Sequence, residues 1–161
     1  MRSTICAFAV LMGAFSSLAT AQLKGGAVGL TVSFLQSPNL GLAYAATSDT
    51  RLSAQVGFDF THDSSGNASS YQFGLSMWRY IINVDNVSGF FGGTIGLDAA
   101  SNPAGTSSSI RLGALYGMEY WFSSRFAVHG TLQVHVSTGK AFGSTVSRVF
   151  TSAESGLTWY L

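Results

Sequence analysis

Three side chains near the end of the sequence have the types and spacing that nucleophilic catalysis needs. His135 and Ser137 are two residues apart, so an extended strand would place their imidazole and hydroxyl groups on one face. Glu154 follows in the next alternating segment. Acyl-transfer enzymes combine a serine nucleophile, a histidine base and a carboxylate that orients the histidine. These residues are therefore one candidate catalytic set. Whether they can act together depends on the direction in which the strands point their side chains.

Charged and titratable side chains form a larger candidate site on the same face of the alternating segments. Histidine titrates closest to neutral pH, so His129 and His135 could control a path for protons or ions. In a narrow interior an unpaired charge costs several kcal/mol, which favours mutual salt bridges instead. The predicted lumen network comprises Arg51, Asp59, Asp98, Arg111, Glu119, His129, His135, Arg148 and Glu154.

Residues 110–122 illustrate the element that must position these groups. The even positions are apolar or aromatic, from Ile110 to Phe122, whereas the odd positions include Arg111 and Glu119. A strand directs alternate side chains to opposite faces, so one face is apolar and the other is small or charged. The segment is longer than the 5 or 6 residues usual for a strand, and a tilted membrane strand needs only about 9 to 11. The pattern therefore predicts a strand of a membrane barrel.

Eight segments alternate in this way, and we predict an all-β, transmembrane, eight-stranded antiparallel up-and-down β-barrel. The predicted strands are residues 25–36, 39–46, 51–62, 70–80, 88–99, 109–122, 125–137 and 145–161. Short predicted turns at 47–50, 82–87 and 123–124 alternate with longer links rich in Gly, Ser and Asn, at 61–69, 100–108 and 138–144. Bacterial barrels place short turns in the periplasm, so we expect both termini there. The alternation breaks near Trp78, where Arg79 takes an outward position.

Strand pairing predicts two tiers of charge in the lumen. The outer tier comprises Asp59, Asp98, Arg111, His135 and Arg148, and the inner tier comprises Arg51, Glu119, His129 and Glu154. We expect His135 opposite Arg148 and His129 opposite Glu154. Asp98 should face Arg111, and Glu119 should lie near His129. We favour the interpretation that these residues form a plug of salt bridges that fills and rigidifies the barrel.

The first residues predict a secretory signal peptide. Arg2 precedes an apolar run at residues 5–15, and Ala19-Thr20-Ala21 has the pattern of a cleavage site. We expect cleavage after Ala21, which leaves residues 22–161 as one β-barrel domain. Cys6 is the only cysteine and would leave with the signal peptide, so we expect no disulfide and no thiolate metal site.

The composition favours a membrane barrel over a soluble one. Charged residues make up 9% of the chain, against about 25% in soluble domains. The formal net charge of +1 gives no indication of a nucleic-acid partner. A soluble lipocalin-like carrier would turn the apolar face inward, and so many aromatic residues would overfill an eight-stranded interior. His62 and Asp63 are too few for a metal site, and we expect no metal or cofactor.

The end of the sequence, residues 154–161, resembles the terminal strand signal of bacterial outer-membrane proteins. Its matching positions are Gly156, Trp159 and Leu161. Residues 44–58 and 113–126 resemble turn-and-strand units of the small eight-stranded outer-membrane barrel superfamily, a porin-like β-barrel group that includes opacity proteins and the OmpA transmembrane domain. The resemblance implies insertion by the barrel assembly machinery, a location in the bacterial outer membrane, and contact with its lipid and lipopolysaccharide. It leaves the oligomeric state open.

Members of that superfamily include adhesins, structural anchors and a few enzymes. We expect no peptidoglycan-binding domain after Leu161, so the anchoring role of two-domain relatives is not expected here. The candidate set His135, Ser137 and Glu154 is similar to that of outer-membrane lipid A deacylases, but our prediction turns His135 into the lumen and away from lipid. We therefore expect a structural or surface-interaction role without enzymatic activity. The alternatives are a narrow ion or proton channel and a lipid A-modifying enzyme.

Overall fold

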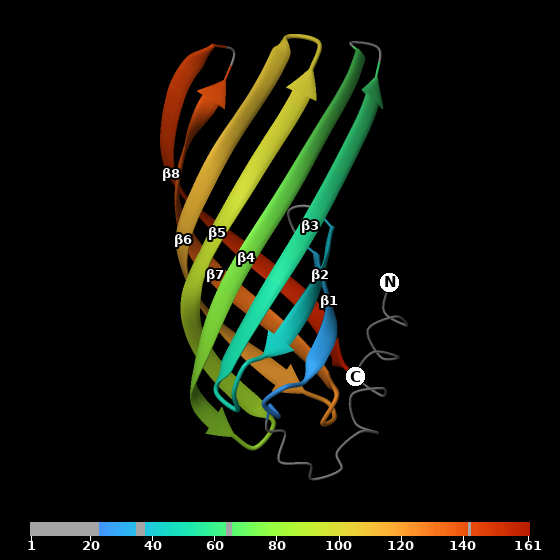
Figure 1. Ribbon diagram of the computed structural model, residues 1–161, viewed down its shortest axis with the longest axis vertical. Helices are drawn as coiled ribbons and strands as arrows, with labels where there is room; N and C mark the ends of the chain where they lie inside the picture. Colours follow the sequence, from blue (N-terminus) through green and yellow to red (C-terminus); the bar gives the residue numbers. More distant parts are fainter. Residues whose placement is uncertain (1–22, 35–37, 64–65, 142) are drawn as a thin grey trace, which may run out of the picture.

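Eight antiparallel strands follow one another in chain order and close into a barrel, with β8 returning to pair with β1 (Figure 1). The computed structural model describes residues 23–34, 38–63, 66–141 and 143–161, so the predicted signal peptide lies outside the described residues. The strands are β1 (Val28–Phe34), β2 (Asn39–Ala45), β3 (Thr50–Asp63), β4 (Gly66–Val84), β5 (Val87–Asn102), β6 (Gly105–Trp121), β7 (Phe126–Ala141) and β8 (Ser144–Tyr160). The predicted up-and-down barrel is confirmed. Within the described ranges, no helix has the length and hydropathy needed to cross a membrane.

Alternation along the strands separates two faces of the wall. The outward face carries large apolar side chains on every strand, and Phe60 and Leu132 are 69% and 67% exposed. This surface, the apolar belt, includes Leu30, Leu42, Leu52, Phe73, Ile95, Leu112, Val134, Val149 and Trp159. The inward face carries the charged, small and hydroxyl side chains. A barrel with apolar residues outside and polar residues inside has the pattern of a transmembrane barrel.

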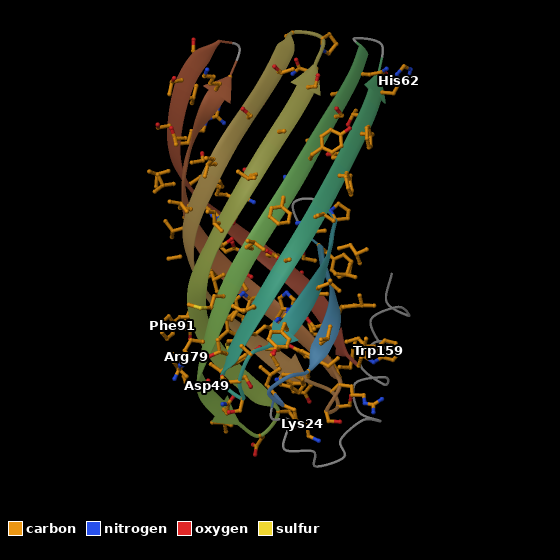
Figure 2. All side chains as sticks on the ribbon, in the orientation of Figure 1. Lys24, Asp49, His62, Arg79, Phe91 and Trp159 are labelled. Atoms are coloured by element: carbon orange, nitrogen blue, oxygen red, sulfur yellow. The ribbon has the colours of Figure 1, made fainter. Side chains whose placement is uncertain are left out.

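The two ends of the barrel differ in the way their strands are joined. Turns between β2 and β3, β4 and β5, and β6 and β7 lie at the same end as Leu161, whose amide bonds to the Val28 carbonyl at 2.8 Å. We call this the inner end. Here Asp49 accepts a hydrogen bond from Arg79 at 2.8 Å on the outside of the barrel. The Thr47 and Thr50 hydroxyls hold the pKa of the Asp49 carboxyl below its usual range. Figure 2 shows Asp49, Arg79 and Trp159 near this end and His62 at the far, outer end.

The predicted long links at the outer end are wrong. Most of residues 61–69, 100–108 and 138–144 belong to strands, and the pairs Asp63↔Gly66, Asn102↔Gly105 and Ala141↔Ser144 close three tight hairpins. Glycines at positive φ make these turns possible: Gly66 at 126°, Gly105 at 140° and Gly143 at 83°. The strands therefore extend well beyond the predicted ones, with serine and glycine on both faces.

The alternation of apolar and polar residues is predicted to break near Trp78. In the structure β4 continues through this point, and only the type of side chain on each face changes. Arg79 still points outward, while Trp78 and Tyr80 point inward and are only 2% and 6% exposed. The predicted turn at 82–87 is shorter, because β4 continues to Val84 after a bulge between Tyr80 and Ile82. The inner end of the lumen therefore holds an aromatic core in place of the purely polar filling that alternation suggested. Its aromatic members are Trp78, Tyr80, Phe90, Trp121 and Tyr160, and Leu115 belongs to the same cluster.

Candidate functional site

A buried ion pair crosses the inner half of the lumen. Arg51 of β3 donates to Glu119 of β6 at 2.9 Å, and both side chains are fully buried. Arg51 also donates to Thr158 at 2.8 Å and to Thr31 at 3.4 Å. The Tyr80 hydroxyl donates to the second oxygen of Glu119 at 2.6 Å. Each charge is thus compensated by a partner of opposite charge and by hydroxyl groups, which is the condition for a stable buried pair.

Aromatic rings enclose this pair. The Arg51 guanidinium lies 4.1 Å from the Trp78 ring centroid, close enough for a cation–π contact. Trp78 stacks on Phe90 at 4.2 Å, and Trp121 stacks on Tyr160 at 5.5 Å. We call the ion pair, Thr31, Thr158 and these rings the inner plug. Because its charges and rings are buried together, the inner plug closes this half of the lumen.

His129 lies inside the plug, packed against Trp78. It pairs across the ladder with Gly156, packs edge-on against Trp78 at 4.9 Å and is 1% exposed. Neither ring nitrogen has a hydrogen-bond partner among the described residues. Gly156 makes room for the ring, since a Cβ there would lie 2.6 Å from His129 Nε2. His129 therefore fills space in the plug.

A small polar cavity of about 60 Å³ lies above the plug, with Trp78 and Leu115 in its lining. Its other lining residues include Gln55, Gln72, Arg111, Gln133, His135, Ser152 and Glu154. His135 bonds to Ser152 at 3.0 Å, and Gln133 donates to Glu154 at 2.9 Å. Arg111 lies 3.4 Å from Asp98 in a partly exposed ion pair. This outer half is polar and open, unlike the plug.

The predicted pairing between β7 and β8 is wrong by two residues. His135 lies opposite Phe150, whose ring stacks on the imidazole at 5.0 Å, and Arg148 lies opposite Ser137. The cause is the turn: the hairpin closes at Ala141↔Ser144 with Gly143 at positive φ, one residue later than expected. A shift of two residues keeps every side chain on the same face of the strand, so the residues predicted to face the lumen still face it.

The shift also changes the composition of the two tiers. Glu154 lies opposite Thr131 and bonds to Gln133, so it belongs with the cavity and not with His129. Glu119 does lie opposite His129. Asp59 and Arg148 are exposed, and neither has an ion-pair partner within the described part of the chain. The nine residues of the lumen network therefore form one buried pair, one partly exposed pair and several separate groups.

The candidate catalytic set is not assembled in the lumen. His135 bonds to Ser152, and Glu154 bonds to Gln133, so no described hydrogen bond joins His135 to Ser137 or Glu154. At the outer end His62 contacts Asn67. Among the described residues, no group of three His, Cys, Asp or Glu side chains could hold a metal ion.

Sequence reasoning missed the residues that complete the inner plug. Thr31, Thr158 and Tyr160 share the inward parity of the charged residues, so alternation alone could have placed them in the lumen. Trp78 and Tyr80 were harder to assign, because large aromatic rings resemble lipid-facing residues until the parity of the strand is known.

The terminal signal residues lie on different faces of β8. Trp159 is exposed on the apolar belt at 61%, Gly156 faces the lumen, and Leu161 follows the strand. This distribution follows from their spacing, because positions 156 and 159 have opposite parity.

Two solved structures are similar to this barrel. The N-terminal β-barrel domain of OprF from Pseudomonas aeruginosa aligns with a TM-score of 0.63 and 13% identity, over 86% of this chain and all of that one. Neisserial surface protein A (NspA) aligns with a TM-score of 0.58 and 17% identity, over 83% of this chain and 92% of that one. No protein-family model and no curated protein matches the sequence. The expected resemblance to small eight-stranded outer-membrane barrels is thus confirmed for the fold.

Proposed function

We propose that this chain is an outer-membrane β-barrel of the bacterial cell envelope with a structural or surface-interaction role and no enzymatic chemistry. The observation that carries the proposal is the fully buried Arg51–Glu119 pair within the inner plug, beneath an outer half that is polar and open. A barrel that is closed by its own side chains suits a rigid envelope component better than a pore.

The apolar belt supports the membrane location, and the turns support an orientation. The belt covers all eight strands, and Arg79 with Asp49 forms a charged rim at the inner end. We infer that this end faces the periplasm together with both termini, and that the three tight hairpins of the outer end face the outside of the cell. The predicted partners follow from this placement: the barrel assembly machinery during insertion, and outer-membrane lipid and lipopolysaccharide afterwards.

The test of the sealed, structural role is a conductance recording. The purified barrel, reconstituted in a planar lipid bilayer, is expected to give no steady single-channel conductance between pH 5 and pH 8, because the plug leaves no water path. A porin of known conductance is the positive control. A pH-dependent conductance that disappears in the His129→Ala or His135→Ala variant would replace the proposal with the channel alternative.

A further inference from the structure

Among the described residues, no strand continues the barrel wall beyond the outer ends of β1 and β2. The described pairing of β8 with β1 ends at Ser155↔Phe34, and that of β2 with β3 ends at Asn39↔Gly57. Beyond these pairs β8 continues over residues 144–154 and β3 over residues 58–63. Figure 1 shows β3 to β8 rising well above the short β1 and β2. We call the space between these two strand edges the lateral opening.

Apolar side chains place the lateral opening at the level of the apolar belt. Phe58 and Phe60 on β3 are 58% and 69% exposed, and Val149 on β8 is 74% exposed. Both phenylalanine rings pack edge-on against Tyr71, at 5.8 and 5.9 Å, in an aromatic cluster at the outer part of the belt. Aromatic clusters of this kind mark a membrane interface. The base of the opening therefore faces the outer part of the bilayer.

Backbone chemistry limits what can occupy this opening. The two free strand edges present N–H and C=O groups that no neighbouring described strand pairs with. Hydrocarbon cannot satisfy them, and open sheet edges do not face lipid tails. Irregular or unpaired backbone at membrane depth occurs where it lines a water-filled or polar space. The occupant must therefore bring polar atoms to the edges.

The interior behind the opening is polar. The cavity above the plug is lined in part by Phe34, Asn39 and Ala153, which lie at the base of the opening, so the cavity reaches it. Farther out is a groove of about 250 Å³. Its lining includes Ser70, Gln72, Asp98, Ser107, Ser109, Ser137 and Arg148. A polar interior thus lies behind the opening.

The charges around this interior favour an anion on the β8 side. Arg111 is paired with Asp98 at 3.4 Å, and Glu154 is held by Gln133. Arg148 faces inward from the free-edge strand, opposite Ser137, and has no ion-pair partner in the described ranges. Asp59 faces inward from β3, on the other side of the opening. An anionic group is therefore attracted to Arg148 and kept from the β3 edge.

We propose that the lateral opening holds the phosphate-bearing head of a membrane lipid, with the phosphate at Arg148 and the acyl chains outside against the apolar belt. The inference rests on the proposed membrane location. A polar head supplies the hydrogen-bonding atoms that the free edges need, and its chains lie against Phe60 and Val149, which are exposed on the apolar belt. Phospholipid and phosphorylated lipid A share this chemistry, and the experiment separates them.

The test is native mass spectrometry of the mature barrel released from detergent micelles. Micelles are doped with phosphatidylglycerol, with lipid A, or with diacylglycerol, which lacks the phosphate. We expect the barrel to retain one lipid molecule from micelles that contain a phosphate-bearing lipid, and none from micelles that contain diacylglycerol. Arg148→Gln should weaken binding about tenfold, the loss of one charge-assisted partner, and Arg148→Lys should lose less. Arg125→Gln, an exposed cation at the inner end, is the matched control and should bind like the wild type.

Each outcome decides the proposal. Retention of either phosphate lipid with dependence on Arg148 supports it and identifies the source. The proposal is overturned if Arg148→Gln retains as much lipid as the wild type, or if the wild type retains only detergent. It is also overturned by a dimer without lipid, in which a strand of a second copy would occupy the free edges. Every sample is first examined for the heat-dependent gel shift of a folded barrel, so a variant that fails to fold is replaced by Arg148→Lys. Failure of the wild type to shift would instead contradict the membrane barrel itself.

Discussion

Arg51 is a full positive charge inside a barrel with no exposed surface of its own. Moving such a group out of water costs several kcal/mol, and here Glu119, Thr158 and the Trp78 ring offset that cost. The compensation is mutual, because Glu119 also receives the Tyr80 hydroxyl. The stability of the inner plug therefore depends on keeping both charges together.

Replacing Glu119 with leucine should be strongly destabilising. The variant leaves the Arg51 charge buried without its partner, and loss of one member of a buried pair costs about 3 to 5 kcal/mol of the free energy of unfolding. Urea unfolding in lipid vesicles, followed by the fraction of protein that keeps its folded gel mobility, measures the change.

Two further variants separate the ion pair from a general effect of substitution. Adding Arg51→Met to Glu119→Leu should restore part of the lost stability, because no lone charge remains. Asp49→Asn breaks the exposed pair with Arg79 and should change stability little. A Glu119→Leu protein as stable as the wild type would contradict the role assigned to the plug.

At the scale of the elements, three outer hairpins depend on tight turns with glycine. Gly143 has φ 83°, and no atom lies within 4 Å of the position that a Cβ would occupy. Gly143→Ala should therefore destabilise through backbone conformation alone, by about 1 kcal/mol, and Gly143→Asn should cost less because asparagine tolerates this region. Urea unfolding of the two variants measures the difference. Equal stability of the alanine variant and the wild type would contradict the left-handed backbone conformation assigned to Gly143.

Strand faces could be predicted from the sequence, but strand ends and one register could not. The faces follow from a period of two, which each segment contains by itself. The outer ends lack that signal, because residues such as Ser107, Ser108 and Ser109 are polar on both faces. The predicted register of β7 with β8 differs by two residues from the observed one, and both registers place each side chain on the same face. The feature that distinguishes them is the turn at Gly143, which has a positive φ.

The candidate site was predictable in its members more than in its contacts. Parity placed Arg51 and Glu119 in one lumen, and the short turn after β6 placed Glu119 opposite His129. The contact between Arg51 and Glu119 joins β3 to β6, across the barrel, so it depends on closure of the whole ring and on the aromatic rings beside it. Neither the closure of the ring nor the position of the aromatic rings can be predicted from a single segment of the sequence.

The whole molecule combines a closed inner half with an open outer half. The plug fills the inner half, which eight paired strands surround, whereas in the described part of the chain no strand lies beyond β1 and β2 in the outer half, whose interior is polar. This arrangement suits the proposed role, with a rigid base and a polar outer half.

The most direct measurement of the central claim is the electrophoretic mobility of the protein from an outer-membrane fraction, in SDS, with and without boiling. A barrel whose backbone groups are paired within the wall resists SDS until it is heated, and the inner half of this barrel is closed in that way. We expect the unboiled protein to run at a different position, which boiling abolishes. A protein found in the soluble periplasmic fraction, with one mobility at all temperatures, would contradict the membrane barrel and favour a soluble carrier.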